Sequence, residues 1–144
     1  MESAAVMTRD VVVVSPLVSV GGAASLMARR KIRHLPVVQD GRVVGILSDR
    51  DLLKHTPDAT CGEAMTTDPL TCLPDTSVSH VARLMLDHRI DCVPIVNSSG
   101  TLTGMVTSTD LLWLLVEPDQ LRRLPFDFQL HLTESDAEAY AAAS

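Results

Sequence analysis

Residues 45–51 read Gly-Ile-Leu-Ser-Asp-Arg-Asp, and residues 104–110 read Gly-Met-Val-Thr-Ser-Thr-Asp. Both stretches follow the pattern Gly-x-x-Ser/Thr-x-x-Asp, and each lies between an apolar run and a pair of leucines. The pattern predicts a strand end, a hydroxyl that caps a helix, and a carboxylate one turn later. Gly45 and Gly104, at the strand ends, permit the close approach of another backbone or of a ligand.

The two carboxylates of this pattern, Asp51 and Asp110, have two interpretations. Together with the hydroxyls of Ser48 and Thr107 they can bind the vicinal hydroxyls of a ribose, as an acidic residue does in dinucleotide-binding folds. Ser-x-x-Asp is also close to a capping box, which stabilises a helix and needs no ligand. The cap is the simpler interpretation of one copy alone, but two copies at matching positions favour a ligand site.

The two stretches belong to an internal repeat. Met7-Thr8-Arg9-Asp10 returns 58 positions later as Met65-Thr66-Thr67-Asp68, and Pro36 returns as Pro94 at the same offset. One inserted residue near Ser98-Ser99 then changes the offset to 59, which pairs Gly45 with Gly104 and Asp51 with Asp110. A small unit has therefore been duplicated.

Each repeat resembles a CBS domain (the cystathionine-β-synthase type), and the tandem resembles a CBS pair, or Bateman module. The resemblance rests on the Met-Thr openings, on Ile-Arg-His-Leu-Pro-Val-Val (32–38) and Ile-Asp-Cys-Val-Pro-Ile-Val (90–96), and on the Gly-x-x-Ser/Thr-x-x-Asp stretches. It covers residues 6–115. It implies two units paired about a pseudo-two-fold axis, one adenosyl-ligand site per unit in a shared cleft, and a homodimer of two modules.

Both repeats show the same order of predicted elements, β-α-β-β-α, so the predicted fold class is α/β. The predicted strands cover residues 11–14, 35–38, 42–47, 70–73, 92–96 and 102–107. Asp40-Gly41, between the second and third of these strands, predicts a hairpin turn. Ser19 and Ser77 are predicted N-caps of longer helices, and shorter helices are predicted over residues 49–55 and 108–116. One such unit is marginally stable alone, so we expect the two to complete a common core.

The predicted domains are repeat one over residues 1–57, repeat two over residues 58–116, and an extension over residues 117–144. In the extension, Phe126, Phe128, Leu130 and Leu132 alternate with polar residues. This period-2 pattern predicts a strand or an extended arm.

Composition excludes several classes of function. The chain has 144 residues, of which 46% are hydrophobic and 21% charged, and its net charge of −6 argues against a nucleic-acid partner. No apolar run is long enough to span a membrane, and no basic region followed by an apolar run resembles a secretory signal, so we expect a cytoplasmic protein. The three cysteines show no metal-type spacing, and no nucleophile–base spacing is present, so we expect no metal site and no enzyme.

The resemblance places the residues around the strand prolines beside the ligand. Arg33 and His34, with Arg50, are predicted to bind a ligand phosphate, because an arginine presents a planar fork of donors. The simpler alternative is solvated arginines and a turn histidine. In repeat two, Asp91 replaces Arg33 and Thr109 replaces Arg50, so a phosphate is disfavoured there. The predicted adenine pocket consists of Val13, Leu35, Pro36, Val93 and Pro94.

The predicted function is a regulatory or sensor module that binds AMP, ADP or ATP between two repeats, requires no cofactor and acts on an effector protein. One alternative is an interaction or structural protein whose ligand sites are vestigial. Another is a binder of S-adenosylmethionine, NAD or a further adenosyl ligand.

Overall fold

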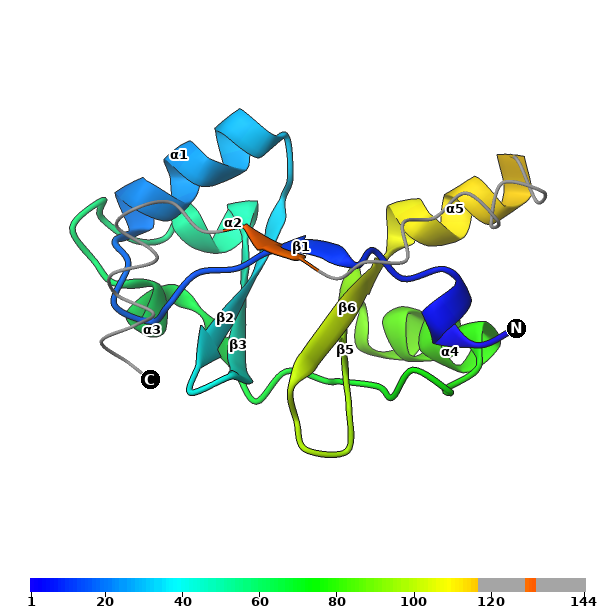
Figure 1. Cartoon of the computed structure of the whole chain (residues 1–144). Helices are drawn as coiled ribbons and strands as arrows, with labels where there is room; N and C mark the ends of the chain where they lie inside the picture. Colours follow the sequence, from blue (N-terminus) through cyan, green and yellow to red (C-terminus); the bar gives the residue numbers. More distant parts are fainter. Residues whose placement is uncertain (117–128, 132–144) are drawn as a thin grey trace. The chain divides into compact units, whose positions relative to one another are not determined.

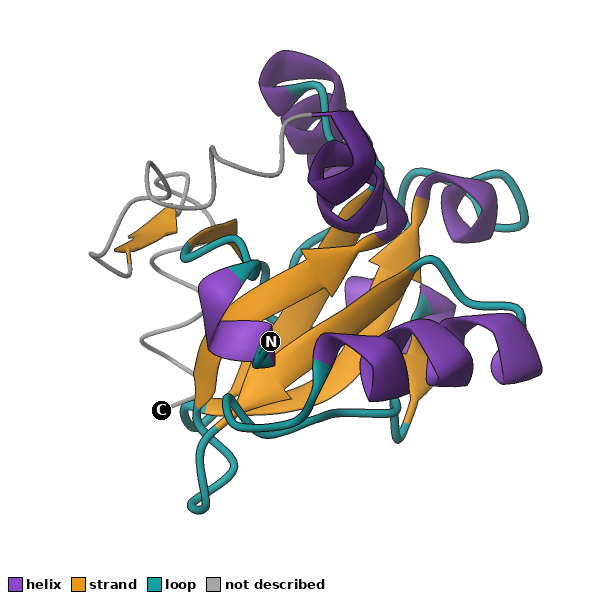
Figure 2. Cartoon of the chain, turned by 90° about the vertical axis from the view of Figure 1, so that its right-hand side faces the viewer, coloured by secondary structure: helices purple, strands orange, loops and turns teal. Residues whose placement is uncertain are grey.

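The computed structural model describes residues 1–116 and 129–131 of the chain (Figure 1). Helices and antiparallel strands are mixed along these residues, which confirms the predicted α/β class (Figure 2). The elements are the 3-10 helix η1 (Ser3–Ala5), β1 (Asp10–Val12), α1 (Val20–Arg30), β2 (His34–Gln39), β3 (Arg42–Ser48), α2 (Asp49–Leu52), α3 (Cys61–Ala64), β4 (Thr66–Thr67), α4 (Val78–His88), β5 (Cys92–Val96), β6 (Leu102–Thr107), α5 (Ser108–Val116) and β7 (Gln129–His131).

The described residues form two compact units. The first-repeat unit consists of residues 12–69, and the second-repeat unit combines Met1–Val11 with residues 70–116. The opening segment of each sequence repeat therefore packs in the unit that holds the rest of the other repeat. This exchange brings Met7 and Thr8 to β6, and Met65 and Thr66 to β3.

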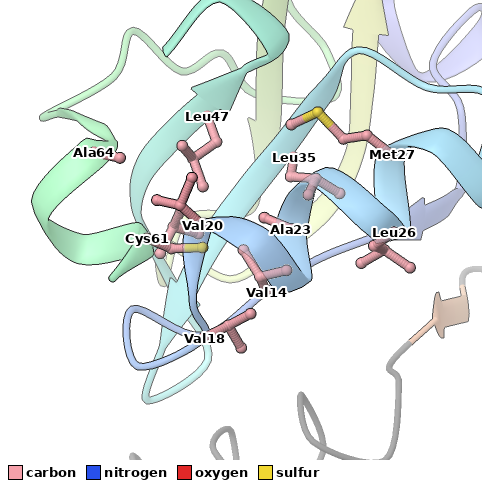
Figure 3. Packing of buried hydrophobic residues seen from close by; sticks show 11 residues of the cluster. Val14, Val18, Val20, Ala23, Leu26, Met27, Leu35, Leu47, Cys61 and Ala64 are labelled. Atoms are coloured by element: carbon pink, nitrogen blue, oxygen red, sulfur yellow. The ribbon is translucent and has the colours of Figure 1, made fainter. Parts of the chain in front are cut away.

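The first-repeat unit contains a three-stranded antiparallel sheet in the order β2-β3-β4. β2 and β3 are joined at Asp40 and Gly41, both with positive φ (53° and 76°), as the predicted Asp-Gly hairpin turn requires. The predicted N-cap of α1 is confirmed, because the Ser19 Oγ accepts a hydrogen bond from the Gly22 N–H at 3.0 Å. Buried side chains from α1, the strands and α3 form one core, including Val20, Leu35 and Cys61 (Figure 3).

The second-repeat unit contains the antiparallel hairpin β5–β6. The Ser77 Oγ accepts a hydrogen bond from the His80 N–H at 3.2 Å, which confirms the predicted N-cap of α4. Apolar side chains of α4 and the hairpin form a core with two residues of the opening segment. Its buried members are Val6, Met7, Cys72, Val81, Met85, Val93, Ile95 and Val106.

The predicted strand 11–14 is replaced by β1 (Asp10–Val12) and an isolated bridge at Val14, and the predicted strand 70–73 is wrong, since only an isolated bridge at Cys72 is present there. Val14 makes one parallel bridge to β2, because its N–H donates to the Pro36 carbonyl (3.1 Å) and its carbonyl accepts from the Val38 N–H (2.8 Å). Cys72 makes the corresponding bridge to β5 beside Pro94. Because proline has no N–H to donate, neither ladder can extend one step further toward the start of β2 or β5.

Two further differences, and one prediction in the extension, concern short segments. α2 ends at Leu52 instead of near His55, and α3 appears where no helix was predicted. A capping box between Thr60 and Glu63 explains α3, since each residue accepts a hydrogen bond from the other's backbone N–H. In the predicted arm, β7 is a strand that pairs with β1, whereas Phe126, Phe128 and Leu132 lie outside the described residues.

Candidate functional site

The junction between β3 and α2, at residues 48–51, carries the first predicted ribose site. Ser48 is extended (φ −110°, ψ 163°), and its Oγ accepts a hydrogen bond from the Asp51 N–H at 3.2 Å. The Asp51 Oδ2 accepts in return from the Ser48 N–H at 2.8 Å. The capping box considered as an alternative is therefore formed. The contacts described for this half-buried side chain leave the other oxygen, Asp51 Oδ1, without a hydrogen bond.

The junction between β6 and α5, at residues 107–110, has the same local geometry. The Asp110 Oδ2 accepts from the Thr107 N–H at 2.8 Å and from the Thr107 hydroxyl at 3.2 Å. The Asp110 N–H lies 3.3 Å from the Thr107 Oγ1, which accepts it. Thr8 adds a contact from the opening segment, since its hydroxyl lies 3.2 Å from Oδ1 and 3.4 Å from Oδ2 of Asp110.

The pKa of the Asp110 carboxyl is shifted by its surroundings. Burial raises its pKa above the ordinary value, while hydrogen bonds from the Thr107 backbone and from the Thr8 and Thr107 hydroxyls act in the opposite direction. The neighbouring Cys92 thiol is buried, and this burial is the main cause that raises its pKa. The negative charges of Asp110 and Asp91 raise the pKa of the thiol further. Burial at this junction therefore disfavours the charged forms of the Asp110 carboxyl and the Cys92 thiol.

Gly45 and Gly104 lie inside β3 and β6, and not at the strand ends predicted for them, and both pack against the exchanged opening segments. A Cβ on Gly45 would overlap the Met65 Sδ and lie 2.9 Å from the Thr66 carbonyl oxygen. A Cβ on Gly104 would lie 2.5 Å from the Met7 Sδ and 3.0 Å from the Thr8 carbonyl oxygen. Protein atoms therefore account for the close approach at both glycines, without a ligand.

The predicted phosphate residues Arg33 and His34 lie beside the first junction. His34 is the β-sheet partner of Ser48, and the Arg33 carbonyl accepts a hydrogen bond from the Asp49 N–H at 3.0 Å. Arg33 and Arg50 have exposed side chains, whereas His34 is half-buried. The structure therefore brings the backbone of Arg33 and His34 to the predicted ribose residues, with two exposed guanidinium groups nearby in the chain.

The second junction places different side chains at the same positions. Cys92 pairs with Thr107, and the Asp91 carbonyl accepts from the Ser108 N–H at 3.0 Å. The charge of the whole unit also differs. The first-repeat unit has seven Lys and Arg against six Asp and Glu, whereas the second-repeat unit has three against six. A phosphate group is therefore better matched by the first junction.

The residues predicted for the adenine pocket lie on two faces of their strands. Leu35 and Val93 are fully buried in the two hydrophobic cores, so their side chains pack within their own units. Pro36 and Pro94 are their immediate neighbours, and successive side chains of a strand point to opposite faces. Val13 is buried and lies outside both core clusters. An adenine contact by any of these residues stays a prediction.

The sequence interpretation did not include Thr8 among the candidate site residues. Its hydroxyl contacts Asp110, which lies 102 positions later in the chain. The Met-Thr opening was visible as a repeated element at residues 7–8 and 65–66. The repeat could have drawn attention to these residues, but only the exchange of the opening segments shows that Thr8 contacts the carboxylate of the second junction.

Two curated proteins show how widely this sequence type occurs. Inosine-5′-monophosphate dehydrogenase of Thermoplasma acidophilum is 33% identical over 117 residues, which cover 81% of this chain and 24% of that protein. The CBS domain-containing protein YhcV of Bacillus subtilis is 36% identical over 111 residues, covering 73% of this chain and 79% of that protein. The chain thus spans about a quarter of the dehydrogenase and most of YhcV.

Three solved structures with a similar fold hold adenosine-containing ligands. The CBS domain pair of MJ0100 with 5′-methylthioadenosine and S-adenosyl-L-methionine gives a TM-score of 0.74 at 29% identity, over 83% of this chain and 98% of that chain. CBSX2 with AMP gives 0.75 at 29% identity, over 81% and 97%. The cytosolic domain of the Mg²⁺ channel MgtE with ATP gives 0.71 at 32% identity, over 78% and 48%.

The family model named CBS domain matches residues 3–58 and, a second time, residues 61–117. The two matches follow the two sequence repeats and include both junctions described above. The chain belongs to the CBS domain family, as a tandem of two CBS domains.

Proposed function

We propose that the chain is a regulatory or sensor module that binds an adenosine-containing ligand, AMP, ADP or ATP, and has no catalytic activity of its own. The observation that carries this proposal is the state of the Asp51 carboxylate. One oxygen is fixed by the Ser48 N–H, while the other accepts no hydrogen bond from the residues described. A fixed carboxylate with one available oxygen suits a ribose hydroxyl, which is a hydrogen-bond donor.

The cations around the first junction support a ligand that carries phosphate. In this proposal Ser48 and Asp51 bind the ribose, and Arg33, His34 and Arg50 bind the phosphate groups. Both guanidinium groups are exposed, so they are free to adopt the conformation that a bidentate contact with a phosphate requires. In the second junction, Thr107 and Asp110 occupy the positions that correspond to Ser48 and Asp51.

The similar structures with AMP, with ATP and with S-adenosyl-L-methionine support the adenosine part of the ligand. They differ in the group attached to the adenosine, so the choice among ligands rests on the residues of this chain. The predicted position of the ligand, in a cleft between two repeats, stays a prediction, as does the cytoplasmic location. Among the helices of residues 1–116, none has the length and apolar character of a membrane span.

A structural role without a ligand is the second candidate function. It is favoured by the capping boxes, which are complete in both junctions from protein atoms alone. A thermal-shift panel with AMP, ADP, ATP, S-adenosylmethionine and NAD separates the two candidates. A ligand present at a hundred times its Kd should stabilise the chain by about 2.7 kcal/mol. If no adenosyl ligand raises the melting temperature, the structural role is the correct one.

We also propose that the module forms a homodimer. Four apolar side chains of α5, those of Leu112, Trp113, Leu115 and Val116, are between 56% and 81% exposed. Contiguous exposed apolar side chains are typical of interaction surfaces. Sedimentation at micromolar concentration should give twice the mass of the chain, and a monomer at that concentration would contradict the proposal.

A further inference from the structure

The hydroxyl of Thr8 makes a contact that the proposed function does not use. It lies within hydrogen-bond distance of both oxygens of Asp110, at 3.2 Å and 3.4 Å. The Thr107 backbone and hydroxyl already donate to Asp110 Oδ2, at 2.8 Å and 3.2 Å. Within the second-repeat unit, protein donors therefore reach both oxygens of this carboxylate.

The corresponding contact is absent from the first junction, although the backbone is equivalent. Thr8 forms a β-bridge with Met105, and Thr66, its counterpart in the repeat, pairs with Ile46 at the equivalent position of β3. Thr66 is exposed, and no hydrogen bond joins its hydroxyl to Asp51 among the contacts of the described residues. The two junctions thus differ in a side-chain contact and not in the register of the strands.

We infer that Thr8 is a specificity-determining residue that closes the second junction to a ribose and leaves Asp51 as the carboxylate that binds it. This inference rests on the proposed function. A ribose hydroxyl must compete for Asp110 with the Thr8 and Thr107 donors that already contact it, because these donors take most of the acceptor positions of the carboxylate. Because the Thr8 hydroxyl donates to a charged group, its displacement lowers the affinity of the second junction roughly ten-fold.

Calorimetry with AMP tests the inference on the full chain and on two matched variants. At AMP concentrations that saturate only the tighter site, the wild type should bind one AMP per chain. Thr8→Val keeps the shape of the side chain but removes the hydroxyl, so it should expose Asp110 and add a second binding event. Thr66→Val makes the same change at the counterpart position and should leave a single event with unchanged affinity.

A second measurement separates this role from a merely structural one. The Asp110 carboxyl is titrated by NMR in the wild type, in Thr8→Val and in Thr8→Ser. Loss of the donor in Thr8→Val should raise the pKa of Asp110 further, whereas Thr8→Ser, which keeps a hydroxyl, should restore the wild-type pKa and the single binding event. This readout needs no ligand, so it applies whether or not AMP binds.

The outcomes distinguish the inference from the function on which it rests. If the wild type binds one AMP and Thr8→Val also binds one with the same affinity, the role of Thr8 is wrong and the proposed function stands. Two equal events in the wild type lead to the same conclusion. If neither protein binds any adenosyl ligand, both are wrong. If the wild type binds one AMP and a second binding event appears only in Thr8→Val, the result supports the closure of the second junction by Thr8.

Discussion

The junctions at residues 48–51 and 107–110 have the same sequence pattern and the same cap, but their carboxylates have different surroundings. Asp51 accepts from the Ser48 N–H through one oxygen, and the other oxygen accepts no hydrogen bond among the described residues. Asp110 accepts from Thr107 and from Thr8, and burial raises its pKa. The same sequence pattern and cap are therefore combined with two different sets of hydrogen-bond donors within one chain.

The difference arises from residues that are distant in sequence. The strand that leads into each junction packs against the opening segment of the other repeat, and a methionine of that segment contacts the glycine of the strand. These backbone contacts are alike in both units. The threonine side chains next to these methionines differ. The Thr8 hydroxyl contacts the Asp110 carboxylate, whereas Thr66 is exposed. Duplication therefore preserved the backbone arrangement more closely than the chemistry of the sites.

The largest effect is expected from Asp51→Ala. If Asp51 binds a ribose, the variant loses charge-assisted hydrogen bonds worth about 1.5–3 kcal/mol. Nucleotide affinity in calorimetry should then fall roughly ten- to a hundred-fold, since 1.4 kcal/mol corresponds to a factor of ten. The variant also loses half of the capping box, so the ligand-free chain should be destabilised by about 1 kcal/mol at most.

Asp51→Asn and Asp110→Ala are the matched controls for that change. Asp51→Asn keeps the size of the side chain and removes the charge, so it should also weaken binding. Asp110→Ala makes the same truncation at the other junction and should change nucleotide affinity much less. A large fall in the ligand-free melting temperature of Asp51→Ala, with affinity intact, would show that this carboxylate serves only the cap.

A second comparison concerns the glycines, where the junctions should behave alike. Gly45→Ala would force its Cβ against Met65 and the Thr66 carbonyl, and Gly104→Ala against Met7 and the Thr8 carbonyl. Overpacking of this kind typically costs about 1–3 kcal/mol. Urea unfolding should show a similar loss of stability in both variants. A loss at only one glycine would show that the other opening segment moves away without cost.

The sequence predicted the local parts of this fold. Ser19 and Ser77 cap α1 and α4 because a hydroxyl before an amphipathic run satisfies free N–H groups of the first turn. The hairpin turn at Asp40-Gly41 was predictable because such a turn requires positive φ at both residues, which Asp-Gly adopts readily. The repeat and its resemblance to CBS domains predicted the family that the comparisons then showed.

The remainder depended on contacts that a linear pattern does not contain. No periodicity shows that Met7 and Thr8 pack against β6 and not within their own repeat. Strands 11–14 and 70–73 were predicted from β-branched or apolar residues, but the absent N–H of Pro36 and Pro94 limits the ladders they can form. The positions of Ser48 and Asp51 were predictable, whereas the availability of one carboxylate oxygen was not.

A smaller effect is expected from reversing the charge that separates the two junctions. Asp91 occupies the position of Arg33 and is exposed, so its charge is partly screened by solvent. Asp91→Arg should strengthen nucleotide binding at the second junction by on the order of three-fold, because exposed charge pairs contribute about 0.2–1 kcal/mol. Calorimetry in the Thr8→Val background, where that junction is open, measures the change. If the affinity of the second junction is unchanged in this variant, the charge of residue 91 does not contribute to the difference between the two junctions.

The smallest effect concerns pH, and it tests whether burial or hydrogen bonding dominates at Asp110. Its pKa in the folded chain lies above the ordinary value of 3.8, so the folded state binds this proton more tightly than the unfolded state does. The resulting contribution to stability is fully present below pH 3.8 and is lost as the pH rises through the higher pKa of the folded state. Cys92 stays protonated in this range because burial raises the pKa of its thiol.

Urea unfolding of the wild type and of Asp110→Asn at a series of pH values isolates this contribution. The free energy of unfolding of the wild type, relative to the variant, should fall as the pH rises from 3.8 and become constant above the pKa of the folded carboxyl. A relative stability that rises with pH would mean that the donors of Thr8 and Thr107 outweigh burial, so that the folded chain favours the carboxylate. Asp110 would then be a strongly hydrogen-bonded anion, and displacing Thr8 from it would cost a ligand more than the roughly ten-fold in affinity inferred above.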